Sequence, residues 1–165
     1  YNEYARGPYN LKDNTVGSWD SIQKNSEYSD NRDIGFSEGR KSDIFGVMIK
    51  DVTDLKVYNR SLILLTKLYE LTRKLPRSEN DLVGQIKKSS KSIPANVAEG
   101  FAKRSSEKEF KRFLKIAIGS SDEVISHLRT ISIVCPRLLN EAKDLAGDYK
   151  IVSKSLNKLQ SVWRS

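Results

Sequence analysis

A row of four basic residues recurs at helical spacing after the midpoint of the chain. They are Lys108, Lys111, Arg112 and Lys115. Positions i, i+3, i+4 and i+7 of a helix fall within an arc of about 100°, so these side chains share one side of the helix. Such a row can neutralise successive phosphates of a nucleic acid and release their counterions, without reading the bases. The spacing favours sequence-independent phosphate binding; the alternative is a solvated helix face that keeps the protein soluble.

Five further basic residues precede this row. Two stand in the predicted loop before it and three on the polar side of the preceding predicted helix: Lys103, Arg104, Lys87, Lys88 and Lys91. Residues 87 to 115 contain nine basic residues and three acidic ones, which strengthens the case for a polyanionic partner. No aromatic residue lies on the basic side of the row. That pattern argues against the stacking surface of a single-strand binder and favours duplex or structured RNA.

Catalytic chemistry has little support in this sequence. The chain has one histidine, His127, and one cysteine, Cys135, so no set of residues has the spacing of a metal site. Glu99 has no second acid or histidine at a spacing that specifies a reaction. No glycine-rich loop follows a predicted strand to hold a phosphate. We predict that the protein is not an enzyme and uses no metal or cofactor.

The net charge of +8 is unevenly distributed along the 165 residues. Residues 48 to 165 hold 23 Lys and Arg against 13 Asp and Glu, whereas residues 1 to 47 hold 6 against 8. Residues 1 to 47 also lack sustained helical periodicity and contain short aromatic islands among Gly, Asn, Asp and Ser. The sequence therefore predicts an irregular or weakly structured upstream segment, 1–47, followed by a basic domain, 48–165.

The basic domain reads as four amphipathic helices. The predicted ranges are 54–74, with Asp54 as its N-cap, then 79–101, then 106 to the "CPR" motif at Cys135–Arg137, and finally 137–164. Ser106 and Glu109 predict a capping box at the third helix, and Pro136 predicts its end. In the first helix the predicted core stripe is Leu55, Tyr58, Leu62, Leu65, Leu68 and Tyr69. Four such helices with short links predict an all-α, antiparallel, up-down-up-down four-helix bundle.

The stretch "SIPANVAEG", residues 92 to 100, places a proline inside the second predicted helix. In a helix interior Pro94 costs about 3 kcal/mol unless neighbouring groups compensate. The wheel points Ile93 and Val97 to the core and leaves small residues outside. We predict that this stretch forms either a helix kink, with Glu99 paired to Lys103, or an oligomer interface. The residues concerned are Pro94, Ala95, Asn96, Ala98 and Glu99.

Two segments carry a family resemblance. "QIKKSSKSIPANVAEGFAKRSSEKEFKRFLKIAIGSSDE", residues 85–123, and "DLKVYNRSLILLTKLYELTRKLP", residues 54–76, resemble the four-helix-bundle proteins encoded by intervening sequences of bacterial large-subunit ribosomal RNA genes. That family is similar in fold to the accessory variability determinants of diversity-generating retroelements, which form pentamers that bind nucleic acid and a reverse transcriptase. The resemblance implies a homo-oligomer, with a pentamer as the expected form, and a reverse transcriptase as a candidate partner.

Two functions of different classes follow from these observations. The first is a non-catalytic, oligomeric nucleic-acid-binding accessory protein that contacts RNA or DNA phosphates. The second is a homo-oligomeric protein-interaction scaffold of the same family without a nucleic-acid function. No run of about 18 apolar residues is present, no basic-then-apolar leader begins the chain, and a single cysteine allows no internal disulfide. We therefore expect a cytoplasmic protein that does not span a membrane.

Overall fold

The computed structural model describes residues 49–164. This part of the chain contains four α-helices, α2 (Lys56–Arg73), α3 (Asn80–Ala102), α4 (Glu107–Val134) and α5 (Leu139–Val162). Three short 3-10 turns, η2 (Val52–Asp54), η3 (Arg77–Glu79) and η4 (Pro136–Leu138), precede α2, α3 and α5. The predicted irregular segment, residues 1–47, lies outside the described residues. Within residues 49–164 no helix is both long enough and apolar enough to cross a membrane.

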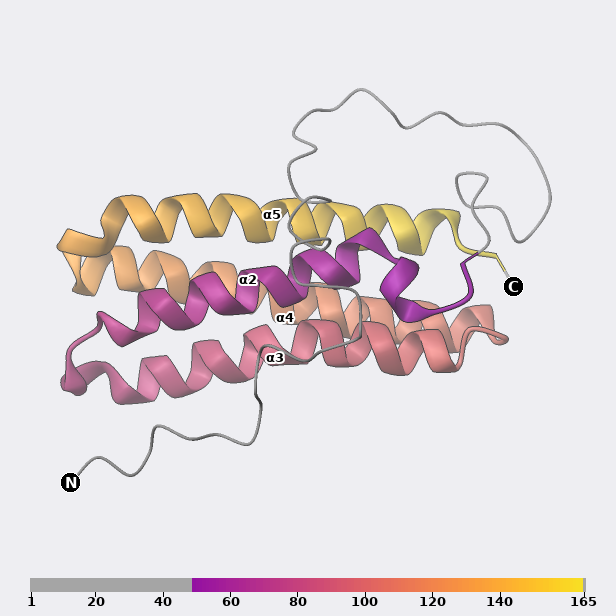
Figure 1. The fold of residues 1–165 in the computed structure, drawn as a ribbon, viewed down its shortest axis with the longest axis horizontal. Helices are drawn as coiled ribbons and strands as arrows, with labels where there is room; N and C mark the ends of the chain where they lie inside the picture. The colour runs from indigo at the N-terminus through magenta and orange to yellow at the C-terminus, as the bar shows by residue number, and fades with distance from the viewer. Residues whose placement is uncertain (1–48, 165) are drawn as a thin grey trace, which may run out of the picture. The chain divides into compact units, whose positions relative to one another are not determined.

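The four helices run side by side with alternating direction (Figure 1). Each packs against its neighbour in the chain, and α5 packs back against α2, which closes the bundle. The contacts of α4 with α3 and α5 are the most extensive, and α2 is packed less closely against its two neighbours. The predicted antiparallel four-helix bundle is therefore confirmed. Short connections enforce this arrangement, because a helix that follows a turn of a few residues must return alongside its predecessor.

The ends of α4 follow the sequence signals. The Ser106 hydroxyl accepts a hydrogen bond from the Glu109 N–H at 3.4 Å, and the helix ends one residue before Cys135, which precedes Pro136. Only one half of the predicted capping box forms in this part of the chain. The backbone N–H of Ser106 donates to the Lys103 carbonyl at 3.0 Å instead of to the Glu109 carboxylate.

The predicted N-cap of the first helix is wrong. Asp54 lies in η2, where its carboxylate accepts hydrogen bonds from the N–H groups of Lys50 at 2.8 Å and Asp51 at 2.9 Å. Leu55 occupies the N-cap position of α2 and makes no side-chain capping bond. A short turn with its own capping box at Asp51 therefore precedes the helix and uses the acid that the sequence pattern assigned to α2.

The core confirms the predicted buried positions Ile93 and Val97 of the second helix and corrects the stripe predicted for the first. On α2 the buried leucines are Leu64, Leu68 and Leu71, all at most 2% exposed. Four members of the predicted stripe are only half-buried: Tyr58, Leu62, Leu65 and Tyr69. The run "LILL" offers two adjacent apolar stripes, and the bundle buries the one centred on Leu64. The other stripe lies at the border with α3.

A buried tyrosine in α5 is a position where a substitution is expected to stabilise the protein. Tyr149 is fully buried, and its hydroxyl has no hydrogen-bond partner among the described residues. Since an unsatisfied buried hydroxyl costs about 1–3 kcal/mol, Tyr149→Phe is expected to raise the free energy of unfolding by about 1 kcal/mol. Urea unfolding at neutral pH measures this change. A loss of stability in the variant would show that the hydroxyl is satisfied in solution.

The same residue predicts a pH dependence. Burial, and secondarily the charge of Asp148, raises the pKa of Tyr149 above its ordinary value of 10.0. The unfolded chain therefore loses this proton at a lower pH than the folded one, so stability is complete below about pH 10 and falls above it. The expected slope is about 1.4 kcal/mol per pH unit. Tyr149→Phe is expected to lack this component when unfolding is compared on both sides of pH 10.

Candidate nucleic-acid interface

The predicted basic row lies on α4, and the buried face of that helix sets its orientation. Phe110 and Leu114 are fully buried in the bundle. Lys108, Arg112 and Lys115 are consequently exposed, and the side chain of Lys111 retains 25% exposure. The structure thus brings the four cations to the outer side of α4, as the helical spacing predicts.

Some of these cations are held by acids of the same region. Lys111 pairs with Glu107 at 2.7 Å and Arg112 with Glu109 at 3.1 Å. The hydrogen bond from Arg112 holds the pKa of Glu109 below its usual range. Lys108 and Lys115 form no ion pair with the residues that the structure describes. Exposed pairs of this kind contribute little to stability, so a phosphate can compete for the paired cations as well.

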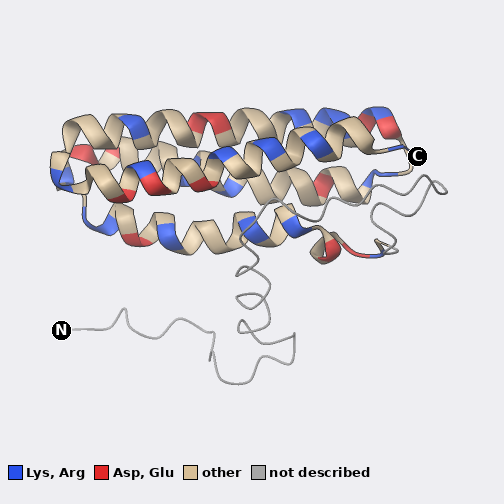
Figure 2. Cartoon of the chain, turned by 90° about the horizontal axis from the view of Figure 1, so that it is seen from above, with Lys and Arg blue, Asp and Glu red and all other residues tan. Residues whose placement is uncertain are grey.

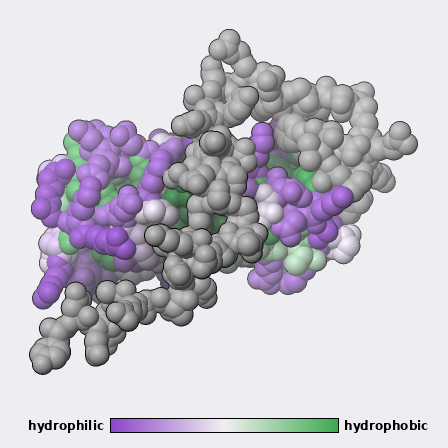
Figure 3. Space-filling view, in the orientation of Figure 1, coloured by the Kyte–Doolittle hydropathy of each residue, from purple (hydrophilic) through white to green (hydrophobic). Residues whose placement is uncertain are grey.

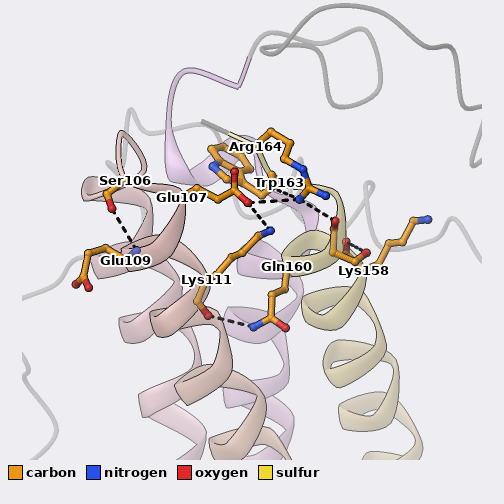
Figure 4. A network of polar contacts seen from close by, with 9 residues as sticks. Ser106, Glu107, Glu109, Lys111, Lys158, Gln160, Trp163 and Arg164 are labelled. Carbon is orange, nitrogen blue, oxygen red and sulfur yellow. Dashed lines mark hydrogen bonds and ion pairs between the residues drawn. The ribbon is translucent and has the colours of Figure 1, made fainter.

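Glu107 also links the row to the end of α5. Its carboxylate lies 3.5 Å from Arg164 as well as 2.7 Å from Lys111 (Figure 4). The Gln160 amide donates to the Lys111 carbonyl at 3.1 Å, which fixes the level at which the two helices meet. The C-terminal turns of α5 therefore lie beside the first turns of α4.

The structure adds three lysines that the sequence analysis missed. Ser153 of α5 donates toward Ser121 at 2.9 Å and Asp122 at 3.0 Å of α4, which shows which side of α5 faces α4. On the helical wheel Lys150 and Lys154 lie about 60° and 100° from Ser153, toward the outer side of α5, and Lys158 lies about 140° from it; all three are exposed. Their spacing of four residues was a usable signal, but only the packing shows that they lie on the helix next to the α4 row.

Together these residues form what we call the α4–α5 basic face. Its members are Lys108, Lys111, Lys115, Lys150, Lys154 and Lys158. Each helix contributes a row of about 10–12 Å, and packed helices lie about 8–10 Å apart. Because a DNA strand carries a charge about every 3.4 Å along the helix axis, the face is large enough to contact several phosphates. Figure 2 shows Lys and Arg distributed over the helices with Asp and Glu between them. The net charge of each surface of the bundle therefore depends on which helices pack side by side.

Two of the other predicted cations lie beside α2. Lys87 places its ammonium 4.7 Å from the centre of the Tyr69 ring, and Lys91 lines a groove with Leu65 and Arg73. Lys88 is exposed on the outer side of α3. Lys87 and Lys91 therefore lie on the α2 side of α3, away from the α4 row, although α3 itself packs against α4.

The remaining two cations lie at the turn between α3 and α4. Lys103 lies 4.4 Å from the centre of the Phe113 ring, and Arg104 lies 4.1 Å from that of Phe101. Arg112 also lies over Phe113, at 4.3 Å. Phe113 is only 5% exposed, so its ring is covered and offers no surface for base stacking.

The SIPANVAEG stretch continues α3 without a break in the helix. Ile93 and Val97 are fully buried, as predicted, and Pro94 is buried too. The predicted pair between Glu99 and Lys103 forms at 2.9 Å. Since Pro94 faces inward, an oligomer contact through this stretch would rest on exposed Ala95 and Glu99 and on half-buried Asn96 and Ala98.

Asn96 and its neighbours satisfy polar groups near the proline. The Asn96 amide donates to the Ser92 carbonyl at 2.8 Å and to its hydroxyl at 2.9 Å. The Ser92 hydroxyl in turn lies 2.9 Å from that of Ser120 on α4. The side chains of Ser89 and Ser90 bond to carbonyls one turn earlier, at 3.0 Å each. These contacts accommodate polar residues and a proline in a helix that packs tightly against α4.

The histidine and the cysteine both lie on or at the end of α4. Cys135 is buried at the end of α4, and the His127 side chain is 16% exposed with its Nε2 3.5 Å from Glu123. Within residues 49–164 no group of three or more His, Cys, Asp or Glu side chains is arranged to hold a metal ion.

Comparison with known proteins agrees with the fold. A family model described as the 23S rRNA-intervening sequence protein matches residues 53–158. A search of curated proteins found no match. The matched region runs from η2 into the last turns of α5 and covers well over half of the chain, including the basic row and the SIPANVAEG stretch. The chain therefore belongs to the 23S rRNA-intervening sequence protein family.

Proposed function

We propose that this protein is a non-catalytic, oligomeric accessory protein that binds RNA or DNA through phosphate contacts on the α4–α5 basic face. One observation carries the proposal: the neighbouring helices α4 and α5 together expose six lysines, of which Lys111 is partly exposed. A surface of this type binds phosphates without reading sequence. The covered ring of Phe113 supports duplex or structured RNA over stacked single strands.

The family resemblance extends the proposal to partners and setting. The resemblance to accessory variability determinants implies pentamers that work with a reverse transcriptase, so we infer a cytoplasmic homo-oligomer, with a pentamer expected, that presents RNA to such an enzyme. A ring would repeat the α4–α5 basic face around its circumference. Repetition raises the overall affinity even where each subunit binds weakly.

A salt series tests the proposal. The purified protein is titrated against an RNA hairpin, a DNA duplex and poly-glutamate, and its mass in solution is measured alongside. Binding to both nucleic acids is expected to weaken linearly in log affinity against log salt, with a slope of about 0.9 for each phosphate neutralised on a duplex. Equal, weak binding to all three polyanions would contradict the proposal.

The second candidate function is a protein-interaction scaffold without a nucleic-acid role. It is favoured by large apolar residues on the surface, namely Ile116, Ile133, Val134 and Ile151, of which Ile133 is 77% exposed. Hydrophilic residues cover most of the described surface visible in Figure 3, with hydrophobic areas between them. An oligomer that binds neither nucleic acid in the salt series would support this candidate.

A further inference from the structure

A groove runs between α2 and α3, on the side of the bundle opposite the α4–α5 basic face. Its lining consists of Leu65, Thr66, Tyr69, Glu70, Arg73 and Lys91. Its volume is about 370 Å³, near the lower end of the range for ligand pockets, and most of its lining residues are exposed. An open groove of this size receives side chains from a segment that lies along it better than it encloses a small molecule.

The floor of the groove belongs to an apolar stripe that the bundle buries only in part. Tyr58, Leu62, Leu65 and Tyr69 recur along α2 at i, i+4, i+7 and i+11, and all four are half-buried. The core uses a different side of the same helix, centred on Leu64. A second stripe along a full helix is the arrangement that receives the apolar face of another helix.

From α3 only Lys91 lines the groove, and small side chains follow it along the same side of the helix. Ala95 is exposed and Ala98 is half-buried, one and two turns beyond Lys91 on the same side of the helix. Small residues leave room for a close approach by a neighbouring backbone. Ser89, Ser90 and Pro94 turn inward, so they do not obstruct this side.

The charge around the groove is positive. Arg73 and Lys91 are exposed and form no ion pair with residues 49–164, and Lys87 contacts the Tyr69 ring and no carboxylate of this part of the chain. Glu70 is the acidic residue in the lining. A complementary occupant therefore carries carboxylates beside its apolar side chains. A nucleic acid would match the charge but offers no apolar face for Leu65 and Tyr69.

We propose that the α2–α3 groove docks an acidic amphipathic helix of a partner protein. The apolar side chains of that helix lie against Leu65 and Tyr69, and its carboxylates face Arg73 and Lys91. The bundle then has two binding surfaces, one on α4 and α5 for phosphates and one on α2 and α3 for a protein segment.

A displayed library of random 16-residue peptides tests this site on the full chain. Selected peptides are expected to share apolar residues at spacings of three and four, with Glu or Asp between them. Their affinities, measured by fluorescence anisotropy, are expected to fall about tenfold or more in Leu65→Glu and in Lys91→Glu. Lys154→Glu makes the same charge change on the opposite side and is expected to leave the affinities within about twofold. Lys91 is exposed, so its variant retains the fold even where Leu65→Glu does not.

Four outcomes would overturn the proposal. The first is a selection whose peptides share no acidic and apolar pattern, and the second is a set of peptides whose affinity is unchanged in both groove variants. A fall in solution mass on Lys91→Glu would assign the groove to a second copy of the chain. Competition between the selected peptides and an RNA hairpin that is relieved by Lys91→Glu, and not by Lys154→Glu, would assign it to nucleic acid.

Discussion

Replacing Lys108, Lys115 and Lys154 together by glutamine is expected to weaken RNA binding by roughly 10²–10³-fold at about 0.1 M salt. The three side chains are exposed, lie on the α4–α5 basic face and form no ion pair among the described residues. Each lost phosphate contact removes about 0.9 from the salt slope on a duplex, so the slope is expected to fall by about 2–3. Lys111 and Arg112 are left in place because each balances a carboxylate, Glu107 or Glu109, whose charge would otherwise repel phosphate more strongly.

A matched triple variant provides the control. Lys87, Lys88 and Lys91 changed to glutamine remove the same charge from the α2–α3 side of the bundle. Its RNA affinity is expected to stay within about threefold of the parent, because only the long-range field changes. Anisotropy titrations at several salt concentrations compare the two variants. Equal losses in both would mean that net charge, not the α4–α5 basic face, determines binding.

The site was partly predictable from the sequence. The α4 row follows from spacing alone, because four cations opposite buried Phe110 and Leu114 must face outward. Which other lysines lie beside this row in space cannot be predicted from spacing. Lys87 and Lys91 are closer in sequence to the row than Lys150 and Lys154 are, yet they lie beside α2, while the lysines of α5 lie on the helix next to the row. Which helices share a surface depends on packing contacts such as Ser121–Ser153, and no single-helix pattern contains that information.

The fold was more predictable, with one instructive failure. The start signal at Ser106 and the stop signal at Pro136 fix the ends of α4, and the bundle topology follows from the short links between helices. In α2, however, apolar residues cover two adjacent stripes, and the periodicity of 3.6 cannot rank them. The bundle buries Leu64, Leu68 and Leu71 and leaves Leu65 and Tyr69 at the groove. The excess of apolar residues that misled the core prediction is the observation that points to a docking site.

A glycine at the end of the SIPANVAEG stretch sets how closely α3 and α4 pack. A Cβ atom at Gly100 would lie 2.7 Å from Cβ of Phe113 and 2.9 Å from a ring carbon of Phe110. The Phe113 Cβ is tied to the α4 backbone, so the helices themselves must separate to admit a methyl group. Gly100→Ala is expected to lower the free energy of unfolding by about 1–3 kcal/mol, despite the better helix propensity of alanine.

Gly119→Ala is the matched control, because Gly119 lies inside α4 with nothing within 4 Å of an added Cβ atom. There alanine is expected to stabilise the protein by about 0.5–1 kcal/mol through helix propensity and reduced freedom of the unfolded chain. Urea unfolding of both variants measures the two changes, which are expected to have opposite signs. If both substitutions stabilised the protein, the close contact at Gly100 would be absent in solution. Opposite signs would show that the sequence keeps Gly100 for proximity to α4, and that this tight pair positions the first turns of the basic row.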